Sequence, residues 1–192
     1  VIDEMSGRRQ SSDGRLQMVD AYGNPMFDGE GYPIWEPTSK ERAVQLFEEA
    51  GMLRRGIAGG PPDLMAVATR LAQAVSLVPD FTDAWFNLGL AQLEQDLLID
   101  AKTSFLKVAE LDAARVEVWL SLGMVEERMG EVAQARKHYG RGIDMAPKNV
   151  DLLNGMARIY RKDGRPELAV KKARAILKLN SNSLDAYNTL GL

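Results

Sequence analysis

The sequence has 192 residues, of which 45% are hydrophobic and 27% are charged, a composition that argues against a chain embedded in a bilayer. Its 24 basic and 27 acidic side chains give a net charge of −3, which offers no electrostatic basis for binding nucleic acid. The absence of cysteine excludes disulfides, thiolate nucleophiles and cysteine-ligated zinc, and is compatible with either a cytoplasmic or a periplasmic location.

Residues 1–37 are predicted to form an irregular N-terminal arm. Glycine and proline interrupt this segment too often for a long helix, and we identify no repeat in it. It contains 3 basic and 7 acidic residues, a net of −4, together with apolar side chains that are too numerous for a purely solvated tail. We therefore expect residues 1–20 to be mobile and residues 21–37 to form an extended arm that packs on the rest of the chain.

A pattern with a spacing of 34 residues follows the arm. One series consists of large side chains: Trp85, Trp119, Leu153 and Tyr187. A second series keeps the same step with Leu88-Gly89, Leu122-Gly123, Met156-Ala157 and Leu190-Gly191, and a third with Ala101, Ala135 and Ala169. Several independent positions that share one period indicate a repeated structural unit.

The unit resembles the tetratricopeptide repeat, whose pattern is W-x2-L-G…A-x3-F…P with a 34-residue period. The segments 83–89 and 119–123 match it closely. The resemblance implies an all-α fold, a right-handed α-solenoid of antiparallel helix pairs, over residues 38–192. The repeats are placed at about 38–81, 82–115, 116–149 and 150–183, with a partial repeat at 184–192.

Eight helices are predicted from these repeats, near 38–55, 62–78, 82–95, 98–111, 116–129, 132–145, 150–163 and 166–179. The first repeat is divergent, since Phe47 precedes Trp85 by one period plus four residues, and we assign the extra residues to the turn at 56–62. In the second helices, Phe105 and Tyr139 occupy the large aromatic position, which Leu71 and Ala173 occupy in the first and last full repeats.

No catalytic, metal or cofactor site is predicted. His138 is the only histidine, so a helix-surface role fits better than that of a general base or metal ligand. Glu126 and Glu127 are adjacent on a predicted helix and point in different directions, so they cannot act as an acid–base pair. We therefore expect a protein that is not an enzyme.

In tetratricopeptide arrays the first helix of each pair lines a concave groove, where family members usually hold peptides. The resemblance places twelve residues there: Asp83, Phe86, Leu90, Leu93, Leu120, Met124, Glu127, Arg128, Asn154, Arg158, Arg161 and Lys162. The groove would be apolar toward its N-terminal side and basic toward its C-terminal side. A partner with an apolar anchor followed by acidic residues would complement it. Alternatively, residues 21–37 cover the apolar part.

These observations favour a protein-interaction scaffold or adaptor that binds a peptide or helix within a larger assembly, which by analogy could belong to a bacterial envelope. One alternative is an accessory domain of a larger enzyme. A nucleic-acid reader is disfavoured by the acidic residues of 82–115. The end of the array could also support self-association. The basic run at Lys171, Lys172, Arg174 and Lys178 is read as a solvated outer face or as an anion-binding patch.

Overall fold

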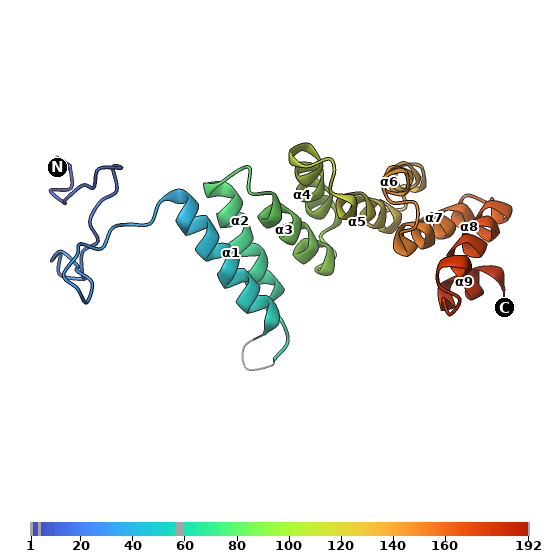
Figure 1. The fold of residues 1–192 in the computed structure, drawn as a ribbon, viewed down its shortest axis with the longest axis horizontal. Helices are drawn as coiled ribbons and strands as arrows, with labels where there is room; N and C mark the ends of the chain where they lie inside the picture. Colours follow the sequence, from blue (N-terminus) through green and yellow to red (C-terminus); the bar gives the residue numbers. More distant parts are fainter. Residues whose placement is uncertain (1, 4, 57–59, 192) are drawn as a thin grey trace.

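The computed structural model describes residues 2–3, 5–56 and 60–191, and within them residues 38–191 form an all-α solenoid (Figure 1). The helices are α1 (Ser39–Arg55), α2 (Leu64–Leu77), α3 (Thr82–Glu94), α4 (Leu98–Leu111), α5 (Val116–Arg128), α6 (Val132–Met145), α7 (Val150–Lys162), α8 (Pro166–Leu179) and α9 (Leu184–Leu190). The eight predicted helices are confirmed, with ends within two residues of those expected. Residues 57–59, in the turn to which the four extra residues were assigned, lie outside the described part.

The helix ends follow local sequence chemistry. Thr38 opens α1 with a capping box, in which its hydroxyl accepts the N–H of Glu41 and the Glu41 carboxylate accepts the N–H of Thr38. The turns inside three successive pairs place Asp96, Gly130 and Gly164 at positive φ angles of 62°, 80° and 68°. Glycine adopts this conformation readily and aspartate tolerates it, which explains why these residues recur at the 34-residue step.

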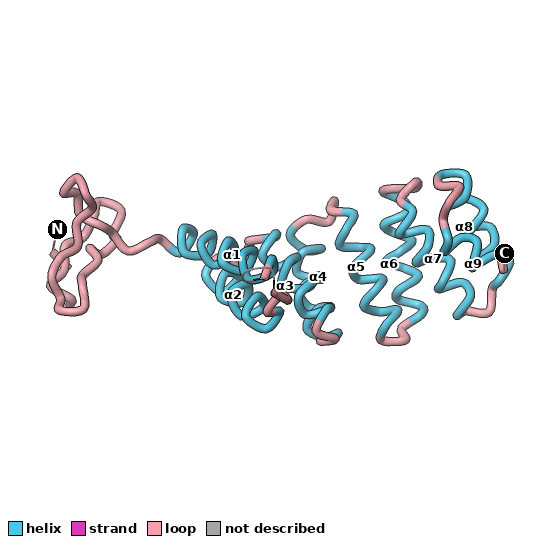
Figure 2. Tube along the Cα trace, turned by 90° about the horizontal axis from the view of Figure 1, so that it is seen from below, coloured by secondary structure: helices cyan, strands magenta, loops and turns pink. Residues whose placement is uncertain are grey.

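The pairs stack in a row, so that each helix packs mainly against its neighbours in the chain (Figures 1 and 2). The first helices also meet directly, α5 with α7 in particular. The core repeats with the same period as the sequence. Ala101, Ala135 and Ala169 are almost fully buried, as are the rings of Phe105 and Tyr139.

Glycine on the first helices makes room for these rings. A Cβ atom added at Gly89 would lie 2.7 Å from the Phe105 ring, and one added at Gly123 would lie 2.5 Å from the Tyr139 ring. Such distances are below any real carbon contact, so glycine at positions 89 and 123 is required to admit the aromatic ring of the second helix.

The N-terminal arm is folded into hairpins and contains a repeat, whereas the sequence analysis predicted an extended segment without one. It forms short hairpins, in which the bridges Gln10–Leu16, Val19–Pro25 and Phe27–Pro33 close successive turns. Asp20 and Asp28 cap equivalent turns eight residues apart, because each carboxylate accepts two backbone N–H groups of its own turn. Glycine at positive φ allows each turn to close: Gly14, Gly23 and Gly31.

Three backbone hydrogen bonds close the hairpins into a ring. The N–H of Met26 donates to the carbonyl of Met18 (2.9 Å), that of Ile34 to Met26 (3.1 Å), and that of Met18 to Ile34 (2.8 Å). The three residues are spaced by eight positions, so the ring is the structural expression of an eight-residue repeat. These hydrogen bonds pair backbone groups of the arm with one another rather than with the helices.

The arm does not lie on the array, contrary to expectation. Figures 1 and 2 show it beyond the N-terminal end of α1, joined by a short linker. Arg15 of the arm pairs with Glu41 at the start of α1 at 3.5 Å. Phe86, Leu90 and Leu120 are therefore not covered by residues 21–37. No helix among the described residues has the length and apolar character needed to cross a bilayer.

Candidate partner-binding surface

Four apolar side chains of the predicted groove lie on the neighbouring first helices α3 and α5, and we call them the apolar strip. It consists of Phe86 and Leu90 from α3 and Leu120 and Met124 from α5. Phe86, Leu90 and Leu120 are partly buried against the core, whereas Met124 is exposed. The strip therefore combines three side chains held against the core with one, Met124, that is exposed.

Phe86 is held in place from two sides. Its ring centroid lies 5.7 Å from that of Phe105 on α4, and the guanidinium of Arg115 lies 4.2 Å from its centroid. Arg115 also pairs with Asp83 at 2.7 Å, so the predicted groove residues Asp83 and Phe86 are tied to the residue that precedes α5. The aromatic side chain is thus preorganised.

Leu93 is misplaced by the sequence prediction. It is 7% exposed and belongs to the core cluster that includes Phe105 and Trp119. Leu93 lies in the last turn of α3, where the helix meets the following pair, so its side chain serves inter-repeat packing rather than a partner.

Glu127 neutralises much of the predicted basic end. Its carboxylate accepts hydrogen bonds from Arg158 Nε (3.1 Å) and Nη2 (3.0 Å) and from the Tyr139 hydroxyl (3.0 Å). Lys162 Nζ lies 3.2 Å away. Burial by itself raises the pKa of the Glu127 carboxyl, but the bonds from Arg158, Lys162 and Tyr139 outweigh it, and the pKa lies below its ordinary value.

The other polar groove residues are also engaged, with one exception. Arg128 donates to Asp96 at 2.6 Å and to the Leu93 carbonyl at 2.9 Å, and Asn154 donates to Asp185 at 3.3 Å. Arg161 is exposed and has no acidic partner among the described residues. The prediction of a freely basic C-terminal groove is therefore corrected, because acidic residues about one repeat earlier or later in the chain pair with most of its polar groups.

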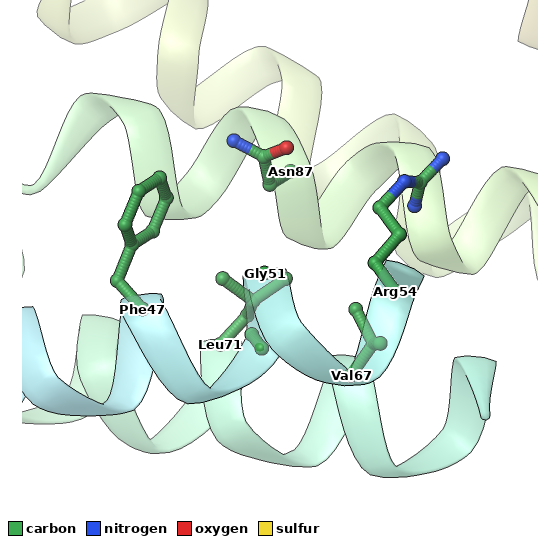
Figure 3. Close-up of a pocket in the computed structure, with 7 residues that line it drawn as sticks. Phe47, Gly51, Arg54, Val67, Leu71 and Asn87 are labelled. Carbon is green, nitrogen blue, oxygen red and sulfur yellow. The ribbon is translucent and has the colours of Figure 1, made fainter. Parts of the chain in front are cut away.

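A pocket that the sequence prediction missed lies between α1 and α3 (Figure 3). Its floor is apolar and its rim carries Arg54 and Asn87; the lining residues are Phe47, Ala50, Gly51, Arg54, Val67, Leu71 and Asn87. Nη2 of Arg54 pairs with Glu94, whereas its buried Nη1 has no hydrogen-bond partner among the described residues. The guanidinium at the rim of the pocket thus has one donor nitrogen that is buried and not used by the described part of the chain.

The pocket follows from a change at one repeat position. Leu71 stands 34 residues before Phe105, so the first repeat has a smaller side chain where later repeats have a ring. Gly51 still provides the space that the ring would fill. A Cβ atom added at Gly51 would meet only the Arg55 side chain, at 3.8 Å. A glycine opposite a shortened core residue was the available sequence signal.

His138 belongs to a buried network. Its Nδ1 lies 2.7 Å from a carboxylate oxygen of Glu126, which is 1% exposed, and Lys102 Nζ lies 3.3 Å from the other oxygen. The network joins α4, α5 and α6. Within the described ranges, no three histidine, cysteine or acidic side chains gather as metal ligands. These contacts assign His138 a structural role.

Family models described as "Tetratricopeptide repeat" match residues 82–115 and 120–183. Human protein O-mannosyl-transferase TMTC3 is 30% identical over 124 residues, which span 62% of this chain and 14% of that protein. Tetratricopeptide repeat protein 8 of Caenorhabditis elegans is 30% identical over 122 residues, covering 62% and 24%. Anaphase-promoting complex subunit 3 of Schizosaccharomyces pombe is 29% identical over 90 residues, covering 47% and 14%. The chain thus spans under a quarter of each relative.

Solved structures share the architecture. MamA from Desulfovibrio magneticus RS-1 superposes with a TM-score of 0.71 at 16% identity, covering 79% of this chain and 82% of that one. Pseudomonas aeruginosa pilF gives a TM-score of 0.63 at 21% identity, covering 78% and 66%. At these identities the comparison establishes the fold alone.

Proposed function

The chain belongs to the tetratricopeptide repeat family, and we propose that it is a non-enzymatic scaffold that holds a segment of a partner protein along its first helices. The observation that carries this proposal is the pocket beside Gly51, whose apolar floor is bordered by a guanidinium nitrogen that pairs with nothing in the described ranges. Ligand sites typically combine such apolar surface with a few placed polar groups.

We propose that the partner inserts a small aliphatic side chain into this pocket. Nη1 of Arg54 then donates to an acceptor on the partner. The chain of the partner continues over Phe86, Leu90 and Met124, where burial of each large apolar side chain contributes about 1.5–3 kcal/mol before entropic costs. Arg161 favours acidic residues at the far end, and its effect weakens with salt.

The test uses a library of displayed random peptides selected on the intact protein. Gly51→Leu fills the pocket, and Phe86→Ala combined with Leu120→Ala removes half of the apolar strip. We expect both variants to lose the selected peptides while the helical circular dichroism is nearly unchanged. Met65→Ser and Ile99→Ser, at exposed positions on second helices, are matched controls that keep binding. Selected peptides that bind all variants equally would place the site elsewhere.

A second function is an accessory domain of a larger enzyme. The similarity to human TMTC3 favours it, since the matching segment is only 14% of a protein named as a mannosyl-transferase. Intact-mass measurement of the natural polypeptide decides between the two. A mass equal to that of this chain would remove the alternative, and a longer polypeptide with a second folded domain would support it. The proposal that the chain acts within a larger assembly is supported by its similarity to an anaphase-promoting complex subunit.

A further inference from the structure

The outer face of α8 carries a cluster of basic side chains with no internal partner. Lys171, Arg174 and Lys178 follow one another at spacings of three and four residues, so they share one side of the helix, and all three are exposed. No acidic residue among the described ones pairs with them. The opposite side of α8, with Ala169, Ala173 and Ile176, is buried.

Apolar side chains accompany the basic ones. Leu168 and Leu179 are 37% and 45% exposed and lie on the same outer side as Lys172. The exposure of Lys171 and Lys178 fits their places in the repeat. One repeat earlier, Lys137 and Asp144 hold the positions of Lys171 and Lys178 and stay exposed although another helix pair follows them. We name the set Leu168, Lys171, Lys172, Arg174, Lys178 and Leu179 the α8 outer face.

The arm at the other end has the complementary character. Asp20, Asp28 and Glu30 are exposed, and Tyr22 and Tyr32, at neighbouring hairpin tips, are 91% and 64% exposed. Hydrogen bonds from the Asn24 side chain and from backbone N–H groups keep the pKa of Asp20 below its ordinary value, so its charge persists at neutral pH. Aromatic side chains among acidic ones complement the α8 outer face, where two leucines lie beside cations.

The two complementary surfaces cannot meet within one chain. The arm lies beyond α1 at one end of the row of helices, and α8 lies at the opposite end (Figure 1). We propose that the arm of one copy binds the α8 outer face of a second copy, so that copies associate head to tail. Such a contact is heterologous and leaves one arm and one outer face unoccupied, so growth continues beyond a dimer.

The pairing predicts an association that depends on concentration and on salt. In sedimentation velocity the wild-type chain should rise above its monomer mass of 21.2 kDa as concentration increases. Raising NaCl from about 0.1 M to about 1 M shortens the Debye length from roughly 10 Å to 3 Å and should return most of the protein to monomer. A wild-type chain that stays monomeric at every concentration would overturn the proposal.

Two sets of substitutions distinguish this contact from other modes of association. The arm variant combines Tyr22→Ser, Glu30→Lys and Tyr32→Ser, and the α8 variant combines Lys171→Glu, Arg174→Glu and Lys178→Glu. Each alone should remain monomeric. Mixed together, they should form a heterodimer that grows no further, because only one intact arm and one intact outer face remain. A mixture that stays monomeric would contradict a head-to-tail contact.

A charge-matched control and a competing surface complete the test. Lys40→Glu, Arg55→Glu and Lys148→Glu reverse three exposed cations elsewhere and should leave association intact. Loss of association in this control would show that net charge alone is responsible. Vesicles containing phosphatidylserine serve as the alternative partner. If the wild-type chain remains monomeric but binds them through Lys171, Arg174 and Lys178, the α8 outer face contacts a membrane rather than a second copy.

Discussion

Glu127 on α5 and Arg158 on α7 form a two-point ion pair, with Nε and Nη2 of the guanidinium 3.1 Å and 3.0 Å from the two carboxylate oxygens. The residues are 31 positions apart, so the pair joins consecutive repeats. The Tyr139 hydroxyl donates to the same carboxylate at 3.0 Å, which links the surface pair to the buried ring that fills the space beside Gly123.

Glu127→Gln should lower the free energy of unfolding at neutral pH by about 1.5–3 kcal/mol, the usual range for hydrogen bonds to a charged group. The folded-state pKa of Glu127 lies below its ordinary value of 4.5. The contribution of the Glu127 carboxylate to the free energy of unfolding is therefore fully present above that value. It is lost as pH falls through the lower, folded-state pKa. Urea unfolding curves should show the two proteins converging below pH 4.5. A constant difference at all pH values would exclude the proposed ionisation.

Trp119→Ala should destabilise the array by about 3–5 kcal/mol, as truncation of a large core side chain does. Trp119 is 3% exposed, its Nε1 donates to the Ala113 carbonyl at 3.1 Å, and Arg141 lies 3.9 Å from its ring centroid. Because repeats couple mainly to their neighbours, hydrogen exchange should accelerate most in α4–α6. Trp85→Ala, at the equivalent but half-buried position, should cost less. Equal acceleration from α1 to α9 would contradict local coupling.

Gly51→Ala and Gly123→Ala should have opposite effects. Both glycines are in helices, where alanine is more favourable by about 0.5–1 kcal/mol. At Gly51 the added methyl group makes an ordinary contact with the Arg55 side chain at 3.8 Å, so thermal unfolding should move to higher temperature. At Gly123 it would lie 2.5 Å from the Tyr139 ring, and overpacking should cost about 1–3 kcal/mol. Calorimetry that finds the same sign for both would refute the account of the pocket.

Asp28→Ala should unfold its hairpin without affecting the array. The Asp28 carboxylate accepts the N–H groups of Glu30 and Tyr32, both at 2.9 Å. Amide NMR signals of residues 18–36 should collapse toward unfolded positions, while the thermal midpoint of the helices stays constant. Asp63→Ala, which removes the cap of α2, is the reciprocal control and should cost the array about 1 kcal/mol. A lowered helical midpoint in Asp28→Ala would mean that the arm stabilises the array.

The helices could be predicted from the sequence because their signal repeats. Trp85 and Trp119, like Phe105 and Tyr139, occupy equal places in successive pairs, so one period determines both the helix ends and the core. The eight-residue repeat of the arm was missed although Asp20 and Asp28, and Pro25 and Pro33, recur at that step, because the apolar places between them are filled by different residues, such as Met26 and Ile34.

The candidate partner-binding surface was less predictable. Leu93 was assigned to the groove from its place in the repeat, but whether the last turn of a first helix faces a partner or the core depends on how the next pair is rotated. The neutralisation of Arg158 by Glu127 depends on the same rotation. The pocket beside Gly51 arises because Leu71 is smaller than the ring found at that position in later repeats. A search for recurring residues does not detect such an empty space directly.

The hydrogen-bond ring of Met18, Met26 and Ile34 sets a different rule of growth from that of the helices. A helix pair leaves both of its sides available, so an open array accepts another pair anywhere along its length. The ring is closed by the hydrogen bond from the N–H of Met18 to the carbonyl of Ile34. A fourth hairpin could join the ring only if that hydrogen bond were broken. Duplication of a segment is therefore expected to be tolerated among the helices and rejected in the arm, so one polypeptide combines a part of adjustable length with a part of fixed count.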